Sequence, residues 1–134
     1  DYGLAMEGAL KLKEISYIHA ESYAGGELKH GTLSLIEAGV PVIALATQVE
    51  VKGKMISNIK EVKARDAFVV GIAQDDDTEV VHTVDTLIKV PASDDFVVSI
   101  LAIVPLQLLA YYIAVSRGND VDKPRNLAKS VTVE

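Results

Sequence analysis

Two short apolar runs, each followed by polar residues, constrain the fold of this chain more than any other feature. Residues 41–46 and 68–73 are continuous and apolar, which is typical of β-strands that are covered on both faces. Between them, residues 51–65 carry their apolar side chains on one helical stripe. Strands that alternate with helices in this way predict a doubly wound α/β fold with a parallel sheet.

The remaining segments extend this pattern. Residues 4–23 have the spacing of one long helix, which Gly25-Gly26 is expected to end. Residues 86–90 predict a third strand, and the apolar residues 96–115 predict a second long helix. Because three strands make a narrow sheet and the chain opens on a helix, we expect a flavodoxin-like sheet that lacks its first strand here.

Composition excludes several classes of function. The 134 residues are enough for one domain. The formal net charge is −6, without a basic run, which argues against a nucleic-acid partner. There is no cysteine, so a disulfide framework, a thiolate zinc site and a cysteine nucleophile are all excluded, in keeping with a reducing, cytoplasmic location.

The uncharged residues 96–115 are long enough to span a bilayer. They contain Ser99, Pro105 and Gln107, and the rest of the chain has the pattern of a soluble α/β unit. We therefore expect a buried core helix and no membrane association.

Three positions could carry chemistry. Lys11 and Glu14 lie three residues apart and so share one face of a helix. They could be a solvated charged stripe, or a carboxylate base with a cation beside it that moves a proton next to a carbonyl. His30, between glycines after the helix, could be merely an exposed loop histidine, or it could serve as an acid or base. Lys129 in the tail could be a surface lysine or an amine that attacks a ketone.

Cofactor and metal sites are not expected. His19, which we place near the buried side of the first helix, His30, and His82 in a polar connection have no ligand spacing. No Walker or G-x-G-x-x-G pattern is present.

Four segments together resemble one family: residues 7–21, 26–31, 104–111 and 120–134. They are similar to the C-terminal end of the glutamine–fructose-6-phosphate aminotransferases, also called glucosamine-6-phosphate synthases. The resemblance covers essentially the whole chain. It implies that residues 1–134 are the C-terminal part of a sugar-isomerase (SIS) domain, with a C-terminal tail at 120–134.

The resemblance also implies roles for individual residues. Glu14 matches the base that carries a proton between C1 and C2 of the sugar, with Lys11 in a supporting electrostatic role. Lys129 matches the lysine that forms a Schiff base with the ketose, and Ala128 lies beside the substrate through its backbone. His30 matches the histidine associated with ring opening, which reaches the active site of a neighbouring subunit.

Partners follow from the same resemblance. They are fructose 6-phosphate or glucosamine 6-phosphate, the upstream SIS and glutaminase domains of a longer chain, and a second copy in a homodimer. We expect this piece alone to be inactive. Two alternatives stay open: a non-catalytic SIS module that senses a phosphorylated sugar, and an isomerase or deglycase without a glutaminase partner. SIS folds host more than one function, so fold alone does not decide.

Overall fold

A three-stranded parallel sheet organises the chain. In the computed structural model, which describes residues 1–127, the strands are β1 (Pro41–Leu45), β2 (Phe68–Gln74) and β3 (Thr86–Val90). They are ordered β1-β2-β3, with Pro41 opposite Phe68 and Val70 opposite Thr86. The predicted parallel α/β architecture is confirmed.

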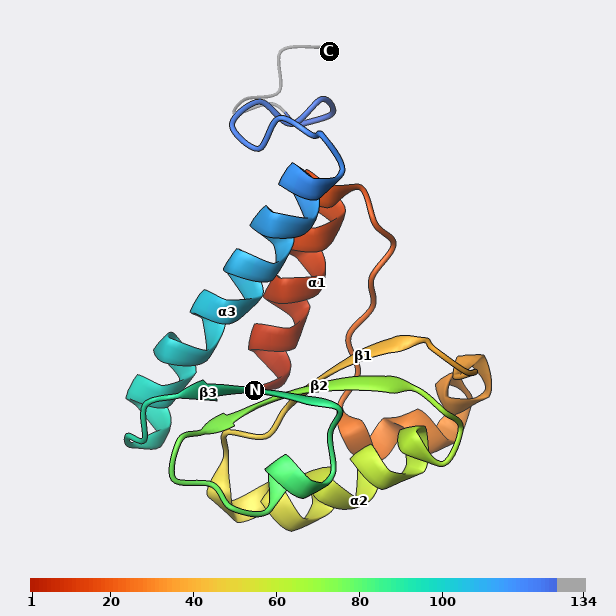
Figure 1. Ribbon diagram of the computed structural model, residues 1–134, viewed down its shortest axis with the longest axis vertical. Helices are drawn as coiled ribbons and strands as arrows, with labels where there is room; N and C mark the ends of the chain where they lie inside the picture. The colour runs from red at the N-terminus through yellow and green to blue at the C-terminus, as the bar shows by residue number, and fades with distance from the viewer. Residues whose placement is uncertain (128–134) are drawn as a thin grey trace.

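Helices cover both faces of the sheet (Figure 1). On one face lie the α-helices α1 (Tyr2–Ser16) and α3 (Asp95–Ser116), side by side. The other face holds α2 (Lys52–Lys63) with the 3₁₀ helices η1 (Gly25–His30), η2 (Thr32–Leu35), η3 (Val49–Val51) and η4 (Val80–His82).

Each face of the sheet has its own core layer, because side chains alternate between the faces of a strand. Toward α3, Leu45, Ile72 and Val90 pack with Val98, Ala102 and Leu106. Toward α2, Ala44 and Val69 pack with Ile59, Val62 and Ala67. These layers fix both helical faces relative to the strand ends.

Small residues let α1 lie close against α3. Gly8, Ala9 and Ser16 are the buried residues of α1. A Cβ added to Gly8 would lie 3.0 Å from Leu106 Cδ1, so only glycine fits without a shift of Leu106. The Ser16 hydroxyl donates a 2.8 Å hydrogen bond to the carbonyl of Ala110, which ties the far ends of the two helices together.

The first helix is shorter than predicted. It ends at Ser16, and Tyr17 adopts the left-handed conformation with φ 55°; residues 17–24 are non-helical and return past the sheet to η1 (Figure 1). The expectation that Gly25-Gly26 ends this helix is therefore wrong. Gly25 instead lies against α2, since a Cβ there would lie 2.5 Å from Asn58 Nδ2 and would displace that amide.

The long apolar helix α3 is buried on one stripe only. Its buried residues recur every four positions: Val98, Ala102, Leu106, Ala110 and Ala114. On the opposite side Phe96 is 76% exposed and Tyr112 is 64% exposed. The predicted buried core helix is therefore found only in part, because α1 and the sheet cover one side of α3 and leave the other exposed.

Among the described residues, α3 is the one helix whose length and apolar composition would suit a membrane span. Core helices of soluble proteins meet the same criteria, so this is weak evidence for a membrane. The Asp94 carboxylate accepts hydrogen bonds from the N–H groups of Phe96 and Val97, which is ordinary N-terminal capping.

Candidate functional site

The structure brings Lys11 and Glu14 together on α1. Lys11 Nζ lies 2.7 Å from Glu14 Oε2 and 3.3 Å from Glu7 Oε1. The side chains of Lys11 and Glu14 are 31% and 25% exposed, so the pair is accessible yet partly shielded from solvent. This arrangement is a carboxylate with a cation fixed beside it.

The charge of Lys11 is stabilised by its neighbours. The hydrogen bond to Glu14 raises the pKa of Lys11 above its usual value, partial burial opposes the rise, and the hydrogen bond to Glu7 adds to it. Lys11 therefore stays protonated near neutral pH. It can support a negative charge on Glu14, but it does not supply the free amine that attack on a ketone requires.

His30 lies away from this pair. It is the last residue of η1, and η1 and α1 occupy opposite sides of the sheet (Figure 1). The imidazole is 75% exposed, and its Nε2 lies 4.0 Å from Glu27 Oε2. The structure therefore does not bring His30 and Glu14 into one site within a single chain.

The other two histidines have no shared site. His19 was expected near the buried side of a helix, but it lies in the non-helical segment after α1, is 84% exposed and faces Glu21 at 3.4 Å. That expectation is wrong because α1 ends before His19. His82 ends η4. Within residues 1–127, no group of three or more His, Asp or Glu side chains could hold a metal.

Two of the predicted site residues, Ala128 and Lys129, lie outside the described residues. The chain just before them contacts the end of α1. The Arg125 guanidinium carbon lies 4.0 Å from the centre of the Tyr17 ring, and the Arg125 amide donates a 2.9 Å hydrogen bond to the Tyr17 hydroxyl. The sequence analysis missed this contact, because the two residues are 108 positions apart.

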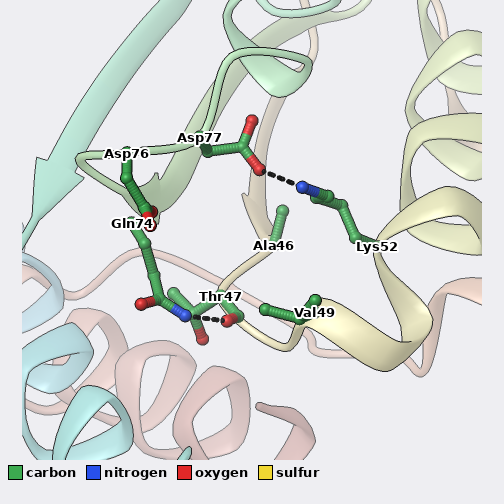
Figure 2. Close-up of a pocket in the computed structure, with 7 residues that line it drawn as sticks. All are labelled: Ala46, Thr47, Val49, Lys52, Gln74, Asp76 and Asp77. Atoms are coloured by element: carbon green, nitrogen blue, oxygen red, sulfur yellow. Dashed lines mark hydrogen bonds and ion pairs between the residues drawn. The ribbon is translucent and has the colours of Figure 1, made fainter. Parts of the chain in front are cut away.

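A cavity of about 180 Å³ opens at the carboxyl ends of β1 and β2, where ligands bind in open parallel sheets. Figure 2 shows Lys52 reaching Asp77 across this cavity, and Gln74 reaching Thr47. The Lys52–Asp77 distance is 2.9 Å, and Gln74 Nε2 donates to the carbonyl of Thr47 at 2.9 Å. Sequence reasoning treated the nearby acidic residues only as a polar turn.

The cavity is lined by polar side chains that already have partners in the chain: Lys52, Asp77, Gln74 and Thr47. Burial alone would raise the pKa of the Asp77 carboxyl, but hydrogen bonds from the Val80 amide, Lys52 and the Glu79 amide outweigh it and lower that pKa below its usual value. Lys52 also lies 3.3 Å from Glu79. The cluster therefore ties α2 to the β2–η4 turn, and its one cation is already neutralised.

The parallel sheet with helices on both faces defines a doubly wound α/β module. The model of the SIS domain family matches residues 1–117. The chain belongs to this family.

Within this family, the chain is similar to one kind of enzyme in particular. The chain is 60% identical over 134 residues to the glutamine–fructose-6-phosphate aminotransferase of Methanosarcina acetivorans, and 62% identical over 134 residues to that of Clostridium acetobutylicum. All of this chain is matched in both cases, and it spans 22% of the length of each relative. The resemblance seen in the sequence is confirmed, and it concerns one part of these longer enzymes.

The fold of this chain is also similar to those of solved structures. The C-terminal domain of the aminotransferase from Francisella tularensis superposes with a TM-score of 0.81 and 41% identity, over 90% of this chain and 34% of that one. A glucosamine-6-phosphate deaminase from Thermotoga maritima gives 0.74 and 30% identity, over 97% of this chain and 37% of that one.

Proposed function

We propose that this chain is the C-terminal part of the isomerase region of a cytoplasmic glutamine–fructose-6-phosphate aminotransferase. Such an enzyme converts fructose 6-phosphate and glutamine to glucosamine 6-phosphate and glutamate. The observation that carries the proposal is the identity of 60% over all 134 residues to a relative of that name, since the matched length includes the tail with Lys129.

Glu14 is the base that moves a proton from C1 to C2 of the sugar. The Lys11 ammonium at 2.7 Å supports this role, because its hydrogen bond holds the Glu14 side chain in a defined position. A general base contributes about 10²–10⁴-fold to a rate.

Lys129 forms the Schiff base, and the backbone of Ala128 lies beside the sugar. The amine nitrogen of Lys129 bonds to C2, the ketone oxygen leaves as water, and ammonia from glutamine later displaces the lysine. The raised pKa of Lys11 supports this division of labour, since Lys11 is held as a cation. Neither step needs a bound cofactor.

His30 opens the sugar ring in the site of a neighbouring subunit. Its exposed position on η1, across the sheet from α1, supports a role outside its own chain. The proposal therefore includes a homodimer. The upstream SIS and glutaminase domains are the other partners, and the exposed apolar side of α3 offers them a surface. Nucleic acid and membrane are not among the partners.

This chain alone is inactive in the proposal. The resemblance assigns the ammonia-releasing cysteine and the Ser/Thr loops for the sugar phosphate to other parts of the enzyme, and this chain contains no cysteine. Formation of glucosamine 6-phosphate from glutamine by the 134 residues alone would contradict this.

Reductive trapping tests the chemistry. Fructose 6-phosphate and borohydride are incubated with the full-length enzyme that carries this chain, and the modified peptide is mapped by mass spectrometry. We expect the adduct on Lys129. An unmodified Lys129, with sugar binding shown independently, would exclude the Schiff-base role and favour a module that senses phosphorylated sugars.

Two variants separate the steps. Lys129→Arg keeps the charge and should abolish trapping. Glu14→Gln keeps the shape of the side chain and should still trap the sugar, while product formation falls by about 10²–10⁴-fold. Loss of trapping in Glu14→Gln would instead indicate that Glu14 is needed to bind the sugar.

A further inference from the structure

The chain leading into the tail is fixed at the end of the helix that carries Glu14. Tyr17 lies three residues after Glu14 and adopts the left-handed conformation, φ 55° and ψ 37°, which is uncommon for a residue other than glycine. Here it ends α1, and the Tyr17 backbone N–H donates to the carbonyl of Leu12. The side chain of Tyr17 makes two contacts of its own, both with Arg125.

Arg125 uses both the face and the hydroxyl of Tyr17. Its guanidinium carbon lies 4.0 Å from the ring centre, within the range of cation–π contacts. Its backbone N–H donates to the Tyr17 hydroxyl at 2.9 Å. One contact positions the side chain of Arg125 and the other positions its backbone, so the direction of the chain at Arg125 is fixed.

Neighbouring hydrogen bonds support this contact. Asn119 Nδ2 donates to the carbonyl of Ile15 at 3.3 Å. The Asp120 carboxylate accepts the N–H groups of Asp122 at 2.9 Å and Lys123 at 3.1 Å, which forms a turn between Asn119 and Arg125. The segment after α3 is thus folded against the end of α1 (Figure 1).

We infer that Tyr17 and Arg125 form an anchor that starts the tail beside Glu14, and that both act as positioning residues for Lys129. This inference rests on the proposed function, since it takes Lys129 as the Schiff-base lysine. From Arg125, four residues reach at most about 14 Å. Tyr17 and Glu14 are separated by only about 4–5 Å along the helix axis.

The size of the effect follows from chain length. Without the anchor, the last fixed position before Lys129 would be Asn119 or the end of α3 at Ser116, so Lys129 would follow it by 10 or 13 positions. Effective concentration falls roughly as the −3/2 power of linker length. Lengthening the distance along the chain from the last fixed residue to Lys129 from four residues to 10 or 13 predicts a loss of about fourfold to sixfold.

The test uses the full-length enzyme with Tyr17→Leu and Arg125→Ala, and with the conservative variants Tyr17→Phe and Arg125→Lys. The rate of borohydride trapping on Lys129 and kcat should both fall about fourfold to sixfold in Y17L and R125A. The KM for fructose 6-phosphate should stay within about twofold, because the anchor does not hold the sugar. R125K keeps a cation over the ring and should recover most of the rate.

The double variant Y17L/R125A should be no slower than Y17L, because Y17L alone already removes both the ring under the guanidinium and the hydroxyl that accepts the Arg125 N–H. Hydrogen exchange of the peptide 119–127 should rise in each impaired variant, while the melting temperature of the enzyme reports intact folding. Wild-type trapping rates in Y17L and R125A would overturn the positioning role. An absence of any adduct in the wild-type enzyme would instead refute the proposed function, with the exchange data still deciding whether the anchor exists.

Discussion

The helices on the two faces of the sheet differ in the side chains that they expose to solvent. On one face, α2 buries Ile59 and Val62 and exposes polar residues such as Lys54, Ser57 and Lys60. On the other face, α3 buries an equally regular stripe but exposes Phe96, Ile100 and other apolar side chains. A helix that is apolar all round is built to be covered on more than one side.

The α2 face is completed within this chain, whereas the outer side of α3 leaves an apolar surface that another protein segment could cover. The α2 face also closes through ion pairs, Lys63 with Asp85 at 2.6 Å and Lys52 with Asp77 at 2.9 Å. The outer side of α3 has no charged residue between Asp95 and Arg117. Substitutions in the two buried core layers should therefore have similar effects on the free energy of unfolding. Substitutions on the two outer surfaces should differ in their effect on association.

The largest expected effect tests whether the inner layers are alike. Ile59→Ala under α2 and Leu106→Ala under α3 each remove a side chain that is 2% or 4% exposed. Both should lower the free energy of unfolding by about 2–5 kcal/mol, through lost burial and the cavity that remains. Urea unfolding followed by circular dichroism measures both.

The comparison fails if the two values differ strongly. A loss below about 1 kcal/mol for Leu106→Ala, beside a full loss for Ile59→Ala, would mean that α1 and α3 are loosely packed in the isolated chain. Ile59→Val, a smaller deletion, is the control and should cost about 0.5–1.5 kcal/mol.

The next effect concerns the ionic closure of the α2 face. Asp77→Ala should cost about 2–3 kcal/mol, because the amides of Glu79 and Val80 lose their acceptor and Lys52 loses one of its two carboxylate partners. Asp77→Asn should cost less, since its Oδ1 can still accept both amides. Thermal and urea unfolding of both variants measure the difference.

The pH dependence has a defined sign. Because the pKa of Asp77 is lowered in the folded chain, its contribution is present above the unfolded value near 3.8 and is lost as the pH falls through the folded value. The stability gap between wild type and Asp77→Asn should be constant from pH 5 to 7 and narrow below about pH 3.8. A gap that widens in acid would refute the assignment.

The sequence predicts the strands better than it predicts the first helix. Strands β1, β2 and β3 were placed within a residue or so, because continuous apolar runs between polar turns are a local signal. The end of α1 at Ser16 depends on long-range contacts, the Ser16–Ala110 bond and the left-handed Tyr17. The helical spacing of apolar residues continues beyond Ser16, so the sequence pattern did not predict the end of the helix there.

The candidate site divides in the same way. Lys11 and Glu14 were predictable as neighbours because helical spacing alone brings them together. The contact of Arg125 with Tyr17, and the joining of Lys52 to Asp77, link residues from separate elements. Only the packing of those elements decides such pairs. The roles of Glu14, His30 and Lys129 came from family resemblance and stay predictions.

A smaller effect should come from the contact between the helix ends on the α3 face. Ser16→Ala removes a buried hydrogen bond to Ala110 but leaves that carbonyl within the ladder of α3. The expected cost is about 1 kcal/mol. Urea unfolding measures it, with the exposed Ser57→Ala on α2 as the matched control at near-zero cost. Equal costs would show that the α1–α3 contact is not formed in solution.

The smallest effect on stability should come from the outer side of α3, and it is the sharpest test of the difference between the two faces. Ile100 and Leu108 are 55% and 48% exposed, so Ile100→Ser with Leu108→Ser should change the free energy of unfolding by no more than about 0.5 kcal/mol per site. Self-association of the isolated chain, measured by sedimentation velocity, should nevertheless fall, because exposed apolar patches drive association. The same exchange at Lys54 and Lys60 should leave association unchanged. If the free energy of unfolding of the α3 variant fell by several kcal/mol, this side of the helix would be covered within the chain itself. The two faces of the sheet would then not differ as described.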